Sequence, residues 1–332
     1  MLMRKDEILF LGGLSMQWSA KKNIIFRITG TILVITAFIF VGLRVYENRD
    51  AFTQWQPTFS NIIFFIVLVF LYSGSVILLA LAWHKLTLLF GNDSISLKAN
   101  LRLYMRTQIA KYIPGNIFSF ASRHIASKAL GFTHIGLVGA AISEIILVIF
   151  ASVSIGLLGF LIWNPNYSIM LFISFVVAII MVYVFLVIFK YLDGRVVLFK
   201  SISFKKKSYR DLFQSLLSVY LLYLMFFIIS GLIFYSIILF LGVDDRAVLV
   251  PAITVYALSW VLGFITPGAS GGMGVREAVM IGLLPNIVDE PVIILAALFF
   301  RLITIFGECM VFGFSFLIPV LEKNLIPYQI DR

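Results

Sequence analysis

Arginines and glutamates inside long apolar stretches are the residues of this chain best suited to chemistry. Glu144 lies ten residues into one such stretch, and Arg301 and Glu308 lie seven positions apart in another, on one face of a helix. A charge at bilayer depth costs roughly 2.5–3.5 kcal/mol, so such residues usually pair or line a polar path. Structural pairing of Glu144 or Glu308 with an arginine is the alternative to a binding role. Either arrangement places a polar seam between helices.

Two Pro-Gly elements interrupt further apolar stretches. The first runs from Lys111 through Pro114-Gly115 to Arg123, and the second runs through Pro267-Gly268 to Arg276-Glu277. In both, seven residues separate Pro-Gly from the arginine. Proline lacks a backbone donor and glycine admits positive φ, so each pair is expected to end a helix within the membrane. The equal spacing predicts an internal duplication, and a chance match is the alternative.

The second element has the composition of an anion-binding loop. Four glycines fall within seven residues, and a helix is expected to begin at Val275. Glycine lets the backbone approach a ligand closely, and the N–H groups and dipole of a helix N-terminus favour an anion. Arg276 adds a positive charge on a fork suited to phosphate oxygens. The competing interpretation is that Pro-Gly caps the helices and that the arginines reach towards headgroups.

We therefore expect one site, where arginines hold an anionic group and glutamates balance them or bind a cationic part of a headgroup. Non-helical backbone at membrane depth persists only where protein buries it or where it lines a wet cavity. Broken helices at a repeat interface recur in transport sites. The candidate residues are Arg123, Pro114, Gly115, Pro267, Gly268, Gly271, Gly272, Gly274, Arg276, Glu277, Arg301, Glu308 and Glu144.

Signals for catalysis are weak. His84, His124 and His134 are scattered without the spacing of metal ligands. The sequence contains no Walker loop. We expect no catalytic residue, no metal and no cofactor, and therefore no enzyme.

The elements that position these residues are predicted to be membrane helices. Of the 332 residues, 61% are hydrophobic and 13% are charged, and the mean hydropathy is +1.04. Soluble domains are nearer 45–50% apolar and about 25% charged, so a soluble enzyme is excluded. Spans need roughly 20 apolar residues. The predicted spans are 24–43, 60–82, 135–162, 168–189, 213–241 and 292–320, with Pro-Gly regions at about 97–131 and 248–284.

The basic residues predict the orientation. Nineteen fall in the N-terminal segment and in stretches 84–131 and 190–212, against three in loops 44–59, 163–167 and 242–247. The net charge of +10 is thus a feature of loops, not a sign of a nucleic-acid partner. Both termini are expected in the cytoplasm of a cell-membrane protein.

The same distribution constrains the two Pro-Gly regions. Each begins and ends on one side, the first on the cytoplasmic side and the second outside. We predict an all-α polytopic membrane protein with six spans and two re-entrant Pro-Gly hairpins in an inverted repeat. If 248–265 crosses fully, the segment after it must return as a broken helix. The expected parts are a cytoplasmic segment 1–23, one transmembrane domain 24–320 and a cytoplasmic tail 321–332.

The stretch from Thr266 to Ala278 resembles a family. Its Gly-Gly-Met-Gly-Val-Arg-Glu core, Gly271 to Glu277, is similar to the flippase-like transmembrane domain of lysylphosphatidylglycerol synthases. Tyr112-Ile-Pro-Gly115 followed by Arg123 is similar to that family's other marked segment, and the resemblance covers about residues 20–322. Ser270 stands where a proline is frequent. Members that make lysyl-lipid carry a soluble synthase domain, which is not expected here.

The resemblance implies translocation or binding of a lipid, and not aminoacylation. We expect a membrane lipid translocase for an anionic phospholipid or a polyprenyl-phosphate-linked lipid. One alternative is a non-transporting lipid-binding or scaffold subunit for a membrane glycosyltransferase or lipid-modifying enzyme. The other is a membrane transferase acting on a lipid-linked substrate, which would need Glu144 or Glu277 as acid or base.

Overall fold

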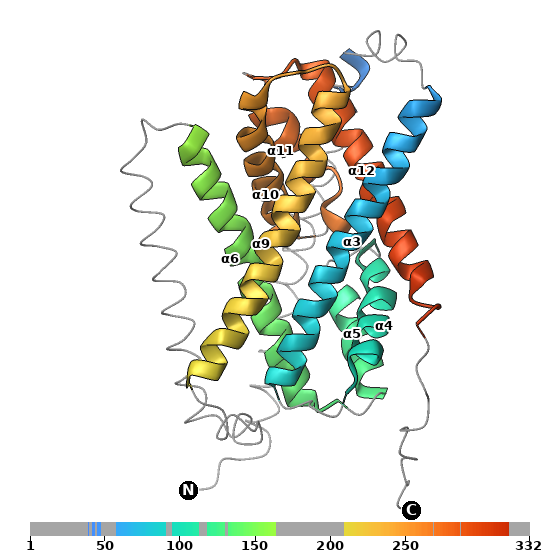
Figure 1. Cartoon of the computed structure of the whole chain (residues 1–332), viewed down its shortest axis with the longest axis vertical. Coiled ribbons are helices and arrows are strands. Elements are labelled where there is room, and N and C mark those ends of the chain that lie inside the picture. Colours follow the sequence, from blue (N-terminus) through green and yellow to red (C-terminus); the bar gives the residue numbers. More distant parts are fainter. Residues whose placement is uncertain are drawn as a thin grey trace, which may run out of the picture.

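The computed structural model describes residues 39, 42–43, 45–47, 58–90, 95–112, 118–129, 132–163, 209–267, 269–285 and 287–318. Within these ranges the chain is α-helical, without a β-strand (Figure 1). The main helices are α3 (Phe59–Leu89), α4 (Leu97–Gln108), α5 (Phe118–Ala129), α6 (His134–Trp163), α9 (Tyr209–Phe240), α10 (Leu249–Ile265), α11 (Val275–Leu283) and α12 (Glu290–Phe314).

Five helices in the described part of the chain are long and apolar enough to cross a membrane. Four of them, α3, α6, α9 and α12, confirm predicted spans. Only α-helices and closed barrels satisfy every backbone polar group in hydrocarbon, so a run of this length and hydropathy folds as a helix. The chain is therefore an all-α, multi-pass membrane protein. The predicted spans 24–43 and 168–189 lie almost entirely outside the described residues.

The helix bounds differ modestly from the predicted ones. α3 continues to Leu89, seven residues beyond the predicted end, and the Asn100 side chain of α4 hydrogen-bonds to its last turns at His84 and Thr87. α12 ends at Phe314 and is followed by a turn over 315–318, short of the predicted end at 320. Tertiary contacts, not hydropathy alone, determine such ends.

The two Pro-Gly regions form helical hairpins at opposite ends of the bundle. In the first, α4 leads through a short 3₁₀ segment (Ile109–Tyr112) to α5, at the lower end in Figure 1. In the second, α10 leads through a 3₁₀ turn (Ser270–Gly272) back to α11, at the upper end. α10 is the fifth helix of spanning length, with Arg246–Ile265 apolar enough to cross. The chain nevertheless returns after it, because α11 packs back along α10 and α12 begins at the same end.

The hairpin tips face each other inside the bundle. The tip of the first contacts the tip of the second, and a Cβ added to Gly271 would lie 3.3 Å from the Tyr112 ring. The described part of each tip contacts α12, the first through Ile109–Tyr112 and the second through the Arg301–Gly271 hydrogen bond. This arrangement gives non-helical backbone the protein cover that it needs at membrane depth.

Small residues let the long helices approach closely. Gly231 of α9 faces Ile253 of α10, and an added Cβ would lie 2.8 Å from the Ile253 Cα. From α6, the Ser152 hydroxyl donates to the Ala257 carbonyl oxygen of α10 at 2.6 Å. Close backbone approach and interhelical hydrogen bonds hold helices together where apolar burial from water does not act. They fix α10 and, through it, the second hairpin.

Candidate headgroup pocket

A buried pocket lies where the two hairpin tips meet. Its volume is about 80 Å³, which leaves room for several water molecules. Both hairpins contribute to it, together with α3, α6 and α9. We call it the central pocket; its walls include Tyr72, Tyr104, Gln108, Lys111, Ser119, Arg123, Glu144, Tyr223, Trp260, Gly263, Gly271, Gly272 and Arg276.

Arg123 of α5 and Glu144 of α6 form a buried ion pair on the wall nearest the first hairpin. The Arg123 Nη1 donates to both Glu144 carboxylate oxygens, at 2.8 and 2.6 Å. Tyr104 donates its hydroxyl to the same carboxylate at 3.3 Å, and the Arg123 guanidinium lies 4.0 Å from the centroid of the Tyr104 ring. Aromatic faces stabilise a cation. The charge of Arg123 is therefore already balanced.

Glu308 of α12 is paired with Lys111 at the tip of the first hairpin. The Lys111 ammonium donates to Glu308 Oε1, and the Tyr72 hydroxyl donates to the same oxygen at 3.0 Å. Glu308 is only 2% exposed, and its Oε2 has no hydrogen-bond partner in the described part of the chain. An unpartnered carboxylate oxygen at such depth leaves an acceptor available to a ligand or to water.

Arg301 of α12 supports the tip of the second hairpin. Its Nη1 donates to the Gly271 carbonyl oxygen at 3.1 Å, and its Nε lies 3.7 Å from Glu277 Oε1. Gly271 has φ of 57°, a conformation that L side chains rarely adopt. The glycine and the arginine together fix the carbonyl that faces α12. One helix, α12, therefore holds both tips, through two side chains about 10 Å apart along its axis.

Arg276 occupies a slot that glycines leave open. An added Cβ would lie 2.7 Å from the Arg276 Cγ at Gly263 and 2.4 Å from its Nε at Gly272. The guanidinium lies 5.4 Å from the centroid of the Trp260 ring. Only 8% of the residue is exposed. Two glycines and one aromatic ring thus determine where this arginine points.

Arg276 has no carboxylate partner among the described residues. The three ion pairs of the central pocket leave it out, and its Nε is buried without a hydrogen-bond acceptor there. A buried cation without a counter-charge is strongly unfavourable. The Arg276 guanidinium is therefore the group best placed to receive an anion.

A family model for the lysylphosphatidylglycerol synthase transmembrane region matches residues 24–308. The chain belongs to this family. The matched segment contains both hairpins and every charged residue of the central pocket. None of the curated proteins is similar enough to this sequence to match it.

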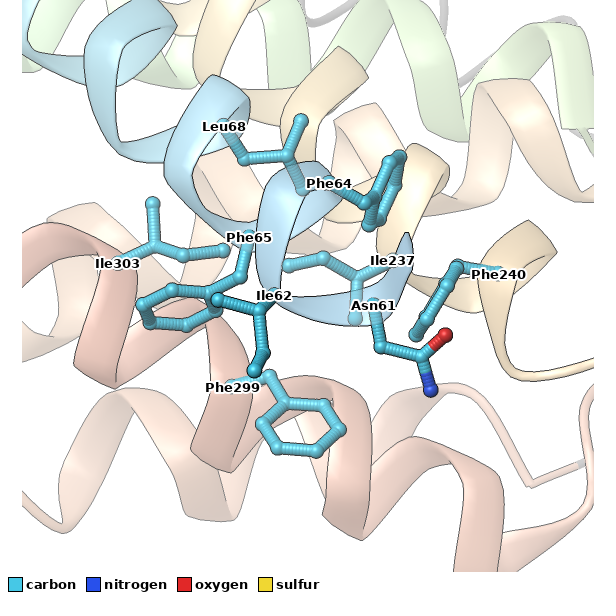
Figure 2. A pocket seen from close by; sticks show the side chains of 9 residues that line it. All are labelled: Asn61, Ile62, Phe64, Phe65, Leu68, Ile237, Phe240, Phe299 and Ile303. Carbon is cyan, nitrogen blue, oxygen red and sulfur yellow. The ribbon is translucent and has the colours of Figure 1, made fainter. Parts of the chain in front are cut away.

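A second hollow of this lysylphosphatidylglycerol synthase transmembrane region is apolar. It has a volume of about 150 Å³ and lies between α3, α9 and α12 (Figure 2). Of the nine described residues that line it, Asn61 alone has a polar side chain. Hydrocarbon suits such walls and a charged headgroup does not. The charged candidate residues all lie elsewhere.

The structure brings most of the sequence-predicted residues together. Arg123, Glu144, Gly271, Gly272 and Arg276 line the central pocket, and Glu277, Arg301 and Glu308 pair around it. Gly274 has φ of 79° and directly precedes α11, which begins at Val275 as predicted. Pro267 lies in the bend after α10, half-buried. Pro114, Gly115 and Gly268 lie outside the described residues.

Sequence reasoning missed several pocket residues. Lys111 was counted only among the basic residues that mark the cytoplasmic side, and the structure pairs its side chain with Glu308. Its position beside a Pro-Gly break in an apolar region was the available signal. No sequence signal marked the pocket residues Tyr72, Tyr104 and Gly263, because a tyrosine or a glycine within an apolar run is ordinary.

Proposed function

We propose that this protein is a lipid translocase of the cell membrane. An anionic headgroup, from a phospholipid or a polyprenyl-phosphate-linked lipid, would bind in the central pocket while its tails stay in the bilayer. The pocket would then be exposed to one leaflet and the other in turn. We propose no chemical reaction on the lipid. We also propose that both termini lie in the cytoplasm.

The unpartnered Arg276 at the meeting point of the two hairpins is the observation that carries this proposal. A guanidinium fork binds phosphate oxygens through two parallel hydrogen bonds. The electrostatic attraction between the two groups is stronger in a site that contains little water. The hairpins start from opposite ends of the bundle and their tips meet at the central pocket. Movement of either hairpin would open a path to its own side.

The test uses the full chain reconstituted in liposomes with a fluorescent phosphatidylglycerol and a membrane-impermeant quencher. Arg276→Gln should slow transbilayer movement at least about tenfold, the loss expected for one charge-assisted hydrogen bond. Arg210→Gln is the matched control, since Arg210 is exposed at the start of α9. A wild-type rate in the Arg276 variant, or the same loss in the control, would contradict the proposal.

A lipid-binding subunit without transport is the second candidate. The observation that favours it is the tie of both hairpin tips to α12, through Lys111–Glu308 and Arg301–Gly271. A protein that only presents a lipid would keep these contacts. It would bind the headgroup without moving it in liposomes, and it would co-purify with a membrane glycosyltransferase or a lipid-modifying enzyme.

A further inference from the structure

The central pocket and its rim carry an uneven set of charges. In the described part of the chain the cations are Lys111, Arg123, Arg276 and Arg301, and the carboxylates are Glu144, Glu277 and Glu308. Each carboxylate pairs with one cation, and Arg276 is left over. Four cations against three carboxylates leave one net positive charge.

This sum does not depend on where the protons lie within the pairs. If Lys111 passes its proton to Glu308, both groups become neutral and the total stays the same. Tyr72, Tyr104 and Trp260 contribute hydrogen bonds and aromatic faces but no formal charge. The net charge of the pocket is therefore independent of the protonation state of any single ion pair.

A net charge that stays unbalanced in a buried pocket costs free energy. Removing one partner of a buried pair leaves an uncompensated charge and is strongly destabilising. A ligand with one negative charge neutralises the pocket. A zwitterionic headgroup leaves the positive charge in place, and a phosphomonoester, which carries about −1.5 to −2 at pH 7, leaves an excess of negative charge beside Glu277.

We infer that the central pocket selects headgroups of net charge −1. The chemical class is a phosphodiester whose substituent is uncharged, carried by a glycerolipid or by a polyprenyl chain. Zwitterionic diesters, phosphomonoesters and diphosphates are disfavoured. This inference rests on the proposed function only in taking the central pocket as the headgroup site.

The test measures which lipids remain bound to the purified full chain by native mass spectrometry. The protein is offered equal amounts of phosphatidylglycerol, phosphatidylcholine and phosphatidic acid with identical acyl chains. Wild type should retain phosphatidylglycerol above the other two. A polyprenyl phosphoryl hexose in the same mixture distinguishes the two sources of diester, and both diesters should rank above phosphatidic acid.

Variants that change the pocket charge should change the ranking in opposite directions. Arg276→Gln removes the surplus charge and should lower the ratio of phosphatidylglycerol to phosphatidylcholine at least about tenfold. Glu277→Gln adds one positive charge and should shift retention towards phosphatidic acid. Arg276→Lys keeps the charge but loses the guanidinium fork, so it should retain less lipid in total while phosphatidylglycerol still ranks above phosphatidylcholine. Arg210→Gln alters the total charge as much as Arg276→Gln does, outside the pocket, and should change nothing.

The inference is overturned if wild type retains the three lipids equally, or if Arg276→Gln and Glu277→Gln keep its ranking. It is also overturned if Arg210→Gln shifts the ranking as far as Arg276→Gln. If Arg276→Gln fails to fold, Glu277→Gln still tests the dependence on pocket charge against wild type, through its expected shift towards phosphatidic acid. If the protein moves lipid in liposomes but shows no dependence of retention on headgroup charge, only this inference is overturned. A charge ranking without transport overturns the translocase proposal and leaves the selectivity.

Discussion

Arg276 is positioned at the residue scale by what its neighbours lack. Gly263 and Gly272 have no Cβ, and the arginine side chain fills the space that their side chains would take. Gly272 also has φ of 74°, which other residues adopt only with strain. The glycine-rich loop therefore acts on the anion site through the arginine, and not only through its own backbone.

Gly272→Ala should displace Arg276 and weaken retention of phosphatidylglycerol. The new Cβ would lie 2.4 Å from the Arg276 Nε, and the left-handed backbone adds about 1–2 kcal/mol of strain. Gly282→Ala in the same hairpin is the control, because nothing lies within 4 Å of its added Cβ. Thermal melting and native mass spectrometry check both variants. Equal melting temperatures and equal lipid retention in the two variants would contradict the inference that Gly272 leaves space for the Arg276 side chain.

The Arg123–Glu144 pair should show strong coupling in a double-mutant cycle. Glu144→Met or Arg123→Met alone leaves one buried charge uncompensated, at a cost of about 3–5 kcal/mol. Replacing both with methionine should recover most of that loss, since an apolar pair needs no counter-charge. The measurement is thermal unfolding in detergent. Additive losses would mean that the two side chains do not depend on each other.

At the scale of elements, α10 is held between α6 and α9. Gly231 lets α9 approach α10 until an added Cβ would touch the Ile253 backbone, and the Ser152 hydroxyl of α6 donates a hydrogen bond to the α10 backbone. Because α10 is the long arm of the second hairpin, these contacts also fix the height of its tip. Packing far from the central pocket thus contributes to its shape.

Gly231→Ala should destabilise the protein by about 1–3 kcal/mol, as overpacking does in a close-fitting core. The Ile253 Cα, 2.8 Å from the new Cβ, belongs to the backbone and cannot rotate away. Gly74→Ala in α3 is the matched control, since its added Cβ meets nothing within 4 Å. A thermal melt that lowers both melting temperatures equally would argue against the close crossing.

At the scale of the whole molecule, the two hairpins start from opposite ends of one bundle. The beginning of α4 lies at one end, and the 241–248 turn and the beginning of α12 lie at the other (Figure 1). From the distribution of basic residues we propose that the first hairpin starts on the cytoplasmic side and the second outside.

Single cysteines should therefore label from opposite faces of the membrane. On a Cys309→Ser background, Lys98→Cys is expected to react with an impermeant maleimide from the cytoplasmic face. Asp244→Cys and Asp289→Cys are expected to react from outside; all three positions are exposed. Labelling of all three from one face would contradict the opposed hairpins, and a reversed pattern would contradict the orientation alone.

Prediction from sequence succeeded where the cause is local. The apolar runs that became α3, α6, α9 and α12, and the break before α11, follow from hydropathy and from glycine within a few residues. Prediction failed where the cause is distant. Lys111 and Glu308 are 197 positions apart, and no pattern in the chain states that they meet.

The sequence by itself determined that this is a multi-pass helical membrane protein with two broken hairpins and a set of charges at depth. Helix length and helix breaking depend on the chain within one or two turns, so these features can be deduced without coordinates. Only the tertiary structure decided which cation each glutamate neutralises, and hence that Arg276 is the one left over. That pairing depends on how α12, α6 and the two hairpins pack in space, because a buried charge is balanced by whatever lies nearest to it and not by its neighbours along the chain.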